Sequence, residues 1–411
     1  MPTHIIPVKI LIICSNLGFG GAERVAVTLA NGFLSRGHHV IVATNLYEKV
    51  NFSLDDGIIL ENIVSTNKNR FKKWFSSVKD FRKLVKHHQP DVVIGIMELC
   101  SLIAKIGTIG TNIPLVATDH YTFDRPQNAP FTKQQWFFKF IVNYIYKHIT
   151  VLTDADKKVI GKKFRGVTVM PNPLSLQPAK ELPLKENIVI AAGRIGGWYA
   201  KGFDVLLQAW TKIQGPTTKI QNWWLQIAGD GKKEDFEYLM SILEDSGFKF
   251  QVSSDGQKIW RSEKYHIEFL GFQKDIESLY RKSAIFALSS RYEGFGLVLI
   301  EAMSQGCAPV ACDYKGRQKE ILCPEGVSSS KYIRQDSSAS SQDSSIEICE
   351  NGIMCEPDHV EELASALEKM IKDEVYRKEV QKNAIERSKF YDMEHTMDRW
   401  EAYLKKVINA D

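Results

Sequence analysis

Two glutamates near residue 300 are spaced in a way that suits the binding of sugar hydroxyls. Glu293 follows an apolar run at 285–289 that is typical of a buried strand, and Glu301 lies further on in an expected helix. The glycines at 294–296 open that helix, whose first N–H groups have no intrahelical partner and can meet a phosphate or a hydroxyl. Carboxylates bind vicinal hydroxyls well because they only accept hydrogen bonds. Exposed helix charge is the competing interpretation.

Two cations occupy a comparable position earlier in the chain. Arg194 comes directly after an apolar run at 188–192, and Lys201 precedes the next expected helix. Cations at the carboxyl end of a parallel strand suit a diphosphate, because arginine can grip it bidentately and lysine adds a point charge. Plain surface solvation of both side chains is the alternative.

A glycine-rich segment at 18–23 stands between a strand pattern and a helix pattern. Its glycines, Gly20 and Gly21 among them, allow a tight turn and leave backbone N–H groups for an anion at the helix N-terminus. A dinucleotide fingerprint needs a third glycine where Glu23 stands, which argues against NAD. A purely structural turn is the other interpretation of this loop.

These residues require elements that gather them at the ends of a parallel sheet. Short apolar runs alternate with helical periods twice along the chain, at 10–14, 39–44, 91–96 and 115–118, and again at 188–192, 224–228, 267–270, 285–289, 308–312 and 353–355. Strand, helix, strand is the βαβ signature, so we expect an α/β fold with two Rossmann-like domains. We place them at 1–172 and 187–389, with a linker at 173–186. A serine-rich tract from Ser328 to Ser345 is predicted to be a solvated loop.

The composition excludes several classes of protein. The 411 residues are 44% hydrophobic and 25% charged, which indicates a globular chain of two or three domains. A net charge of +4 is too weak for a dedicated nucleic-acid binder. The seven cysteines form no CxxC pair, so we expect reduced thiols with no disulfide or zinc framework. The apolar run at 10–14 is too short for a secretory signal, and the stretch 99–118 is interrupted by polar residues, so no membrane span is expected.

Taken together, the motifs resemble those of a known family. Gly-Gly-Ala-Glu-Arg at 20–24, Gly-Arg with Lys-Gly at 193–202, Ala-Gly-Asp-Gly at 228–231 and the E-x7-E element at 293–301 resemble the retaining glycosyltransferases of family 4, of the capsular and lipid-linked oligosaccharide type. The resemblance covers essentially the whole chain. It implies a GT-B fold, two Rossmann-like domains facing across a cleft, with a final helix near 390–411 that crosses back to the N-terminal domain.

The resemblance also implies roles for individual residues. Arg194 and Lys201 would hold the donor diphosphate, Glu301 the ribose and Glu293 the transferred sugar. His120 follows the apolar run at 115–118, where such enzymes carry a histidine facing that sugar. The implied catalytic set is Glu293, His120, Arg194 and Lys201, and the implied binding set adds Gly20, Gly21, Phe295, Gly296, Leu297 and Glu301. Arg194 and Lys201 stand seven positions apart, two more than is usual in the family.

Most of the excess charge lies in one segment. From Lys68 to His88 there are eight Lys or Arg and one Asp, a net charge of +7. Apolar residues recur there at helical spacing and define one expected face: Phe71, Trp74, Phe75, Val78, Phe81, Leu84 and Val85. A second segment, from Phe131 to His148, combines aromatic residues with three lysines and no acid. Aromatic and basic residues together suit an anionic membrane surface, while ordinary packing on the sheet is the alternative.

We therefore expect a cytoplasmic hexosyltransferase, peripheral at the inner face of the membrane. It would move a hexose or N-acetylhexosamine from a UDP-sugar to a glycan acceptor carried on a polyprenyl diphosphate. No metal, no cofactor and no nucleic acid are expected, because the two cations and the helix N-terminus at Gly296 would stabilise the leaving diphosphate. A nucleotide-sugar epimerase of the same fold and a non-catalytic sugar-nucleotide-binding protein are the alternatives.

Overall fold

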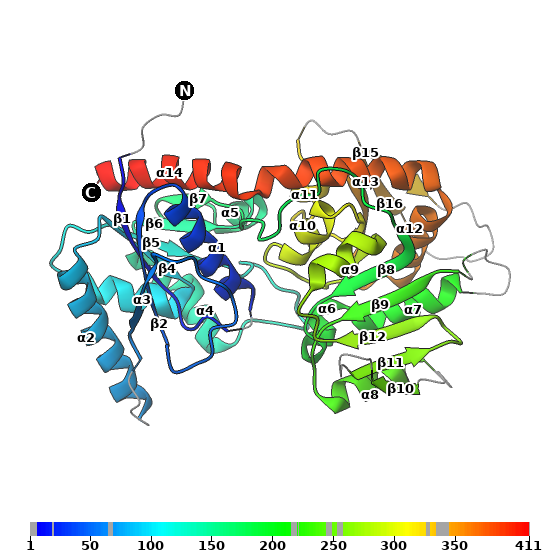
Figure 1. The fold of residues 1–411 in the computed structure, drawn as a ribbon, viewed down its shortest axis with the longest axis horizontal. Helices are drawn as coiled ribbons and strands as arrows, with labels where there is room; N and C mark the ends of the chain where they lie inside the picture. The colour runs from blue at the N-terminus through cyan, green and yellow to red at the C-terminus, as the bar shows by residue number, and fades with distance from the viewer. Residues whose placement is uncertain are drawn as a thin grey trace. The chain divides into compact units, whose positions relative to one another are not determined.

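A computed structural model describes residues 6–18, 20–64, 69–214, 220, 222–243, 249–252, 258–325, 329–333 and 345–410. The chain forms two compact units, an N-terminal unit of Met1–Ser175 with Tyr391–Asp411 and a C-terminal unit of Leu176–Phe390. Each unit is a sheet covered by helices (Figure 1). The expected α/β class with two Rossmann-like units is therefore confirmed.

The N-terminal unit is built on a seven-stranded sheet of order β3-β2-β1-β4-β5-β6-β7, in which every strand runs parallel to its neighbours. The strands are β1 (Lys9–Ile13), β2 (His39–Thr44), β3 (Ile59–Asn62), β4 (Val92–Ile96), β5 (Leu115–Thr118), β6 (His148–Val151) and β7 (Val167–Val169). The order steps outward from β1 on both sides, so the carboxyl ends of β1, β4 and β5 lie next to one another at one edge.

Helices fill the crossovers that parallel strands require. They are α1 (Gly21–Ser35), α2 (Arg70–His88), α3 (Glu98–Gly107), α4 (Lys133–Phe140), η1 (Val142–Ile145) and α5 (Asp154–Ile160). The central strand β1 is buried on both faces, which explains its unbroken apolar run. Leu11 and Ile13 of β1 belong to one core cluster with Phe81 of α2 and Ile103 of α3.

The last helix, α14 (Met393–Ala410), belongs to the N-terminal unit. It packs against α1, where the rings of Phe33 and Trp400 meet edge to face at 6.1 Å. Arg36 forms an ion pair of 2.9 Å with Asp398, and His38 Nε2 lies 3.2 Å from a Glu401 carboxylate oxygen. Residues more than 360 positions apart in the chain thus pack together.

The C-terminal unit has a ten-stranded sheet of order β10-β11-β12-β9-β8-β13-β14-β17-β16-β15. Its strands are β8 (Glu186–Ala192), β9 (Trp224–Ala228), β10 (Lys249–Val252), β11 (Lys258–Ser262), β12 (Ile267–Gly271), β13 (Ser283–Leu288), β14 (Ala308–Cys312), β15 (Ser329–Ile333), β16 (Ser345–Cys349) and β17 (Gly352–Cys355). From β12 to β17 neighbouring strands are parallel, and each edge is extended by antiparallel pairs.

The helices of this unit cover the parallel strands. They are η2 (Ile195–Gly197), α6 (Trp198–Lys201), α7 (Phe203–Ile213), α8 (Lys233–Ser241), α9 (Ile276–Lys282), α10 (Leu297–Ser304), α11 (Lys319–Leu322), α12 (Val360–Lys372), α13 (Glu374–Ser388) and the short η3 (Lys389–Tyr391) at its end. The core joins β8 and β9 to α7 and α12, with Trp210 of α7 fully buried.

Two features of this unit differ from expectation. The serine-rich tract was predicted to be a loop, but Ser329–Ile333 forms the edge strand β15, which pairs with β16 in antiparallel register. The backbone hydrogen bonds between β15 and β16 outweigh the preference of a serine-rich sequence for a loop. Residues 326–328 and 334–344 of this region lie outside the described residues. The antiparallel strands β10 and β11 also went unpredicted, although Lys249–Val252 alternates polar and apolar residues, because the two runs are only four and five residues long.

The prediction of seven free thiols is wrong for one pair. Cys323, directly after α11, forms a disulfide with Cys349 of β16, and their Cα atoms lie 5.8 Å apart. The two cysteines are 26 positions apart, so no spacing motif could have revealed the pair. The other five cysteines are buried free thiols. Among the described helices, none is long and apolar enough to cross a membrane.

Candidate active site

The loops that follow β8 and β13 bring Lys201 and Glu293 into direct contact. The two strands are parallel neighbours, so their carboxyl ends share one edge of the sheet. Lys201 Nζ lies 2.5 Å from Glu293 Oε1, and Ser290 Oγ donates to the same carboxylate oxygen over 2.7 Å. A Cβ added at Gly193 would lie 3.2 Å from the Lys201 side chain, so the lysine stem passes close over this glycine. A cation and a carboxylate predicted separately therefore form one polar centre.

Arg194 begins the same β8 loop and is exposed to solvent. The next residue fixes the loop, because the Ile195 amide donates to the Asp230 carbonyl over 2.7 Å. Asp230 belongs to the Ala-Gly-Asp-Gly segment after β9, and a Cβ at Gly229 would lie only 1.8 Å from the Gly193 carbonyl oxygen. The backbones of the loops after β8 and β9 are thus in close contact, while the Arg194 side chain next to this contact is exposed to solvent.

The two glutamates of the E-x7-E element have different surroundings. Helix α10 begins at Leu297, and Gly296 caps it with a φ of +89°, a left-handed conformation that favours glycine. Glu293 stays outside the helix, in the loop that precedes a buried Phe295. Glu301 lies in the second turn and is only 1% exposed. The structure therefore sets the carboxylates at different depths, as expected from the sequence.

The glycine-rich turn of the N-terminal unit leads into α1. Gly20 precedes this helix and Gly21 begins it, while Phe19 lies outside the described residues. A Cβ at Gly20 would lie 2.1 Å from a Glu23 carboxylate oxygen. The first turn thus places its own carboxylate over the N-terminus of α1, where negative charge is favourable. An anion that binds there must displace or share this position.

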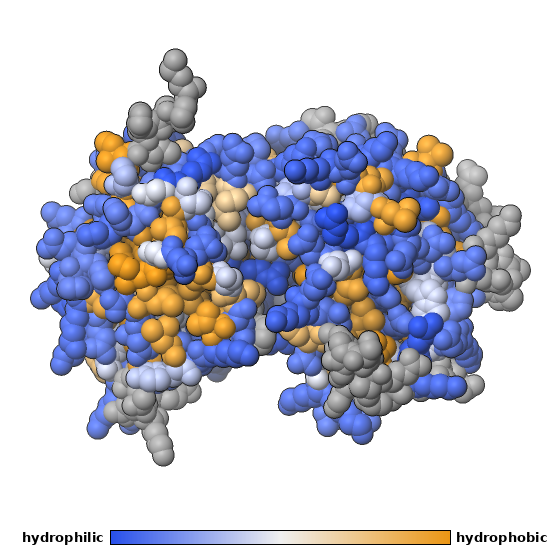
Figure 2. Space-filling view, in the orientation of Figure 1, coloured by the Kyte–Doolittle hydropathy of each residue, from blue (hydrophilic) through white to orange (hydrophobic). Residues whose placement is uncertain are grey.

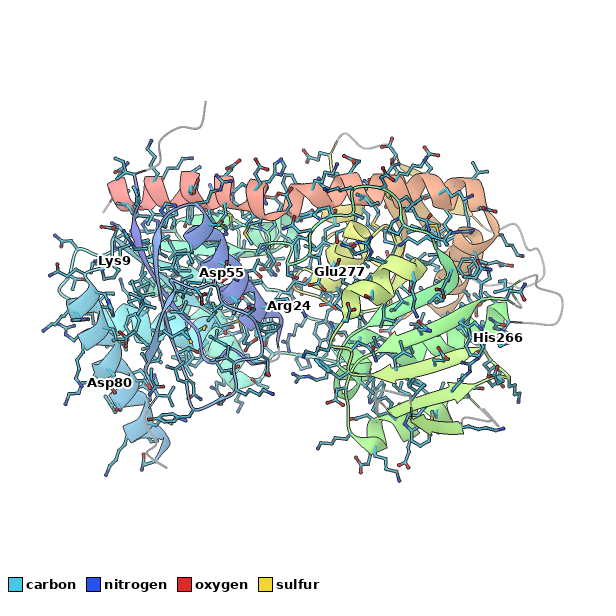
Figure 3. All side chains as sticks on the ribbon, viewed as in Figure 1. Lys9, Arg24, Asp55, Asp80, His266 and Glu277 are labelled. Atoms are coloured by element: carbon cyan, nitrogen blue, oxygen red, sulfur yellow. A yellow bond between two sulfur atoms is a disulfide. The ribbon has the colours of Figure 1, made fainter. Side chains whose placement is uncertain are left out.

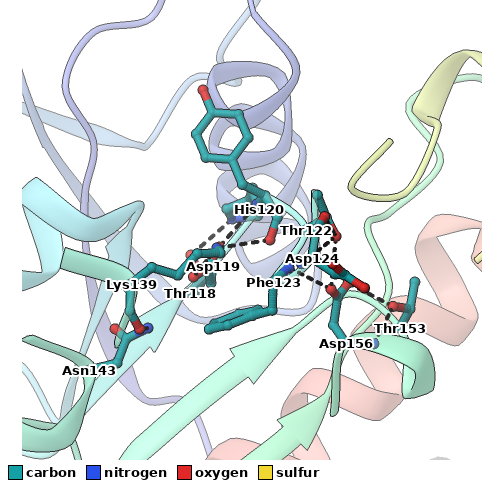
Figure 4. Close-up of polar contacts among 11 residues, drawn as sticks. Thr118, Asp119, His120, Thr122, Phe123, Asp124, Lys139, Asn143, Thr153 and Asp156 are labelled. Carbon is teal, nitrogen blue, oxygen red and sulfur yellow. Dashed lines mark hydrogen bonds and ion pairs between the residues drawn. The ribbon is translucent and has the colours of Figure 1, made fainter. Parts of the chain in front are cut away.

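His120 lies after β5, at the carboxyl edge of the N-terminal sheet (Figure 4). Its Nε2 is 2.9 Å from Thr118 Oγ1, and its Nδ1 is 3.1 Å from Asn172 Oδ1. The one proton of the Thr118 hydroxyl is donated to the Gly95 carbonyl over 3.0 Å, so a neutral ring donates from Nε2 to Thr118 Oγ1 and presents Nδ1 as an acceptor to the Asn172 side-chain amide. Loss of hydration on burial lowers the pKa of His120 to about 4, so the imidazole is uncharged near neutral pH.

Asp119, beside this histidine, forms a buried ion pair with Lys139 of α4 (Figure 4). Lys139 Nζ lies 2.7 Å from both carboxylate oxygens of Asp119 and 3.0 Å from the Tyr121 carbonyl, and it stands over the Phe123 ring at 3.9 Å. Lys139 is only 1% exposed. It was grouped with the basic surface of segment 131–148, which is wrong, because its charge is needed inside the unit. Tyr146 of that segment is also buried.

Several polar residues of the site could not be recognised in the sequence. Ser290 and Arg291 flank the E-x7-E element, and Asn172 contacts His120 from 52 positions away. One feature of the sequence indicates a role for Arg291: it is a charged residue two positions before the first glutamate of the E-x7-E element. Its partner Asp204 lies 87 positions away, a distance at which sequence alone shows no pairing.

The described His, Cys, Asp and Glu side chains include one group close enough together to hold a metal ion by geometry, Cys323, Glu347 and Cys349. The two sulfur atoms in this group are already bonded to each other. The group therefore offers no set of free thiolate ligands.

Comparisons with known proteins identify the family of this chain. Residues 186–373 match the model described as glycosyl transferases group 1, and residues 19–177 match the model of glycosyltransferase family 4. An uncharacterised glycosyltransferase of Haemophilus influenzae is 28% identical over 404 residues, which cover 96% of this chain and 99% of the relative. A Campylobacter jejuni enzyme is 26% identical, with 98% and 99% covered, and is named as an alpha-1,4-N-acetyl-D-galactosaminyltransferase acting on a diNAcBac-PP-undecaprenol-linked GalNAc disaccharide.

Among solved structures, Anabaena Alr3699/HepE in complex with UDP and glucose superposes with a TM-score of 0.69 at 16% identity, covering 97% of this chain and 100% of that one. At that identity the likeness shows the fold, which is GT-B. The two family models together span most of the chain, and the relatives are similar over their full length. Both comparisons identify a glycosyltransferase. The chain belongs to the group 1 glycosyltransferases of family 4, and it is a hexosyltransferase with the GT-B fold.

Proposed function

We propose that this glycosyltransferase moves a hexose or N-acetylhexosamine, with retention of anomeric configuration, from a UDP-sugar to a membrane-linked glycan in polysaccharide or lipid-linked oligosaccharide synthesis. The contact between Lys201 and Glu293 carries the proposal, because it joins a diphosphate ligand to a sugar ligand at one sheet edge. The Campylobacter relative named for transfer to a polyprenyl-linked glycan and the Anabaena structure with UDP and glucose support the substrate classes.

In the proposed reaction, the bond between the anomeric carbon and the diphosphate oxygen breaks, and negative charge builds on UDP. Exposed Arg194 and half-buried Lys201 stabilise that charge, together with the N-terminal end of α10, where the helix dipole favours negative charge. These groups act without a metal. The acceptor hydroxyl attacks from the side of the departing diphosphate and transfers its proton to it, so the configuration is retained.

Glu293 is proposed to bind hydroxyls of the transferred sugar, with the backbone of Phe295, Gly296 and Leu297 beside it. When the diphosphate binds, Lys201 moves its strongest contact from Glu293 to the phosphate, which frees the carboxylate for the sugar. Glu301 is proposed to hold the ribose, and His120 to contact the transferred sugar through its neutral ring. The loop at Gly20 and Gly21 is proposed to bind a substrate anion.

Transfer can be tested directly with purified protein. UDP-glucose, UDP-galactose, UDP-GlcNAc and UDP-GalNAc are each incubated with and without a polyprenyl-diphosphate-linked oligosaccharide in detergent, and UDP release and glycolipid mass are measured. We expect a mass gain of one sugar, and nuclear magnetic resonance should show an α-linkage formed from the α-donor. An epimerised donor without transfer, or a β-linked product, would overturn the proposal.

We also infer that the N-terminal unit binds an anionic membrane surface. Phe71 and Phe75, one turn apart on α2, are 78% and 64% exposed, whereas Phe81 and Val85 of the same expected apolar face are buried. Exposed lysines surround them: Lys72, Lys73, Lys79, Lys83 and Lys86. Asp80, labelled in Figure 3, is the one acid of this helix. It pairs with Lys83 over 2.8 Å. Lys68 itself lies outside the described residues.

Exposed aromatic side chains of the second segment add to this surface. Trp136 and Phe137 of α4 and Tyr144 of η1 are exposed. Figure 2 shows apolar side chains at the surface over a broad area of the N-terminal unit. Because an anionic leaflet attracts each adjacent lysine by about 1 kcal/mol at most, the attachment should be reversible and weaken with salt. This chemistry fits a protein peripheral to the inner, cytoplasmic face of a membrane.

Liposome sedimentation distinguishes this surface from an ordinary solvated helix. We expect binding to vesicles with anionic lipid but not to neutral ones, and loss of binding in the Lys72→Glu, Lys73→Glu, Lys79→Glu triple variant. The matched control reverses Lys157, Lys158 and Lys162, which are exposed in and after α5 of the same unit. Equal loss in both triple variants would mean that only net charge matters, and salt-insensitive binding would contradict the inference.

A further inference from the structure

Arg291 lies two residues before Glu293, the first residue of the E-x7-E element, and its side chain is almost fully buried. Nη1 donates to the Tyr199 carbonyl over 2.6 Å, and Nη1 and Nη2 together hold the two carboxylate oxygens of Asp204 at 2.7 and 2.8 Å. Nε pairs with Asp358, and the guanidinium stacks over the Tyr199 ring at 4.2 Å. All three guanidinium nitrogens of Arg291 therefore contact acceptors inside the C-terminal unit.

The contacts of Arg291 and its neighbour Ser289 converge on the end of α6. The carbonyls of Tyr199, Ala200 and Lys201 accept, in order, from Arg291 Nη1, from the Arg291 amide at 2.9 Å and from Ser289 Oγ at 2.8 Å. Carbonyls at the end of a helix lack intrahelical partners, so external donors fix them. At Gly202, with a φ of +61°, an added Cβ would lie 1.9 Å from the Ser289 carbonyl oxygen. The backbone on either side of Lys201 is thus held against the loop after β13.

We propose that Arg291 is a positioning residue, which fixes the end of the long Arg194–Lys201 loop so that the ammonium of Lys201 stays at the diphosphate site beside Glu293. The inference rests on the proposed role of Lys201 in binding the leaving diphosphate. The inference also explains how a loop two residues longer than is usual in the family can still position Lys201. The two extra residues add conformational freedom to the backbone, and the hydrogen bonds to the three carbonyls restrict that freedom again.

Arginine is needed for this task because its planar fork meets the Tyr199 carbonyl, both Asp204 oxygens and Asp358 at once. A lysine keeps the positive charge, so Asp204 is not left without a counter-charge, but one ammonium cannot reproduce the fork. The substitution Arg291→Lys should therefore loosen the loop without removing the charge. Misplacing a group that acts on the transition state lowers kcat more than it raises KM.

Arg377→Lys is a matched control in the same unit. Arg377 Nη1 also holds carbonyls at a helix end, those of Met370 at 2.8 Å and Ile371 at 2.6 Å, and its guanidinium lies over the Trp223 ring at 5.1 Å. It has the same kind of structural contacts without any to α6. Tyr199→Phe is the second control, because the Tyr199 ring and carbonyl, which Arg291 contacts, are kept.

The first measurement is amide hydrogen exchange of peptides that cover residues 195–202. We expect exchange about tenfold faster in Arg291→Lys than in the wild type, with no change in either control, because the substitution releases the Tyr199 carbonyl and the Asp204 carboxylate from the guanidinium. Unchanged exchange in this segment would overturn the inference whatever the activity. Asp204→Asn, which weakens the same grip from the acceptor side, replaces Arg291→Lys if that variant does not fold.

The second measurement is a double-mutant cycle in donor turnover. Arg291→Lys should lower kcat about tenfold in the wild-type background and less than about twofold in the Lys201→Ala background, because the arginine acts through the lysine. Effects that multiply would show a general structural role and overturn the inference, even if Lys201→Ala is itself impaired. Wild-type turnover by Lys201→Ala would instead refute the proposed role of the lysine, and the inference would fall with it.

Discussion

Replacement of Lys201 by alanine tests the proposed site most directly. The Lys201 side chain is 27% exposed and that of Glu293 14%, so solvent partly screens their ion pair. Removing such a pair should change the free energy of unfolding by about 1 kcal/mol or less. Turnover should suffer more, because the ammonium faces charge that develops on the leaving diphosphate. A lost charge there costs about 2 to 4 kcal/mol, or about 30- to 1,000-fold in kcat/KM.

The comparison is with Lys369→Ala. Lys369 lies on α12, pairs with Asp373 over 3.2 Å and is 24% exposed, so it matches Lys201 in burial and pairing but lies away from the β8 and β13 loops. Both variants are assayed for UDP release from the donor and for thermal midpoint. We expect similar small changes in midpoint, with loss of turnover in Lys201→Ala alone. Equal kcat/KM values for the two variants would refute the reasoning.

Three further predictions concern the neighbouring residues. Arg194→Ala should lower turnover at least tenfold with an unchanged thermal midpoint, because the side chain is exposed in the folded chain; near-wild-type turnover would remove this residue from the site. Glu293→Gln should impair transfer while UDP affinity, measured by calorimetry, stays within about twofold, whereas Glu301→Gln should weaken binding of both UDP and donor. Equal effects on UDP affinity would show that the two roles are misassigned. His120 should make stability depend on pH: its pKa is lowered from 6.5 to about 4, so between these values the unfolded chain binds a proton that the native chain does not. Stability should therefore fall, by at most about 3 kcal/mol, as the pH drops from 6.5 to 4, and His120→Gln should flatten that part of the curve in urea unfolding; an unchanged slope would contradict the assignment.

The fold class, the family and the positions along the chain of most of the parallel strands could be predicted from the sequence. Apolar runs such as that of β1 are long enough to be buried on both faces, and glycines such as Gly296 are required wherever a loop turns into a helix with positive φ. These signals are local, so they can be identified without knowing the partners of each residue. The motif residues Lys201 and Glu293 were found in the same way.

Which charged residues lie at the candidate site and which are buried in ion pairs that stabilise the fold depends on tertiary packing. Lys139 was predicted on a basic surface, yet it is buried against Asp119, while the one expected apolar face of α2 is divided between exposed Phe71 and buried Phe81. The grip of Arg291 on Asp204 and the disulfide between Cys323 and Cys349 join residues far apart in the chain. Such pairs form only when particular strands and helices become neighbours in the fold. The burial of a side chain and its partner are then set by residues distant in the chain, so the local sequence contains no pattern that predicts them.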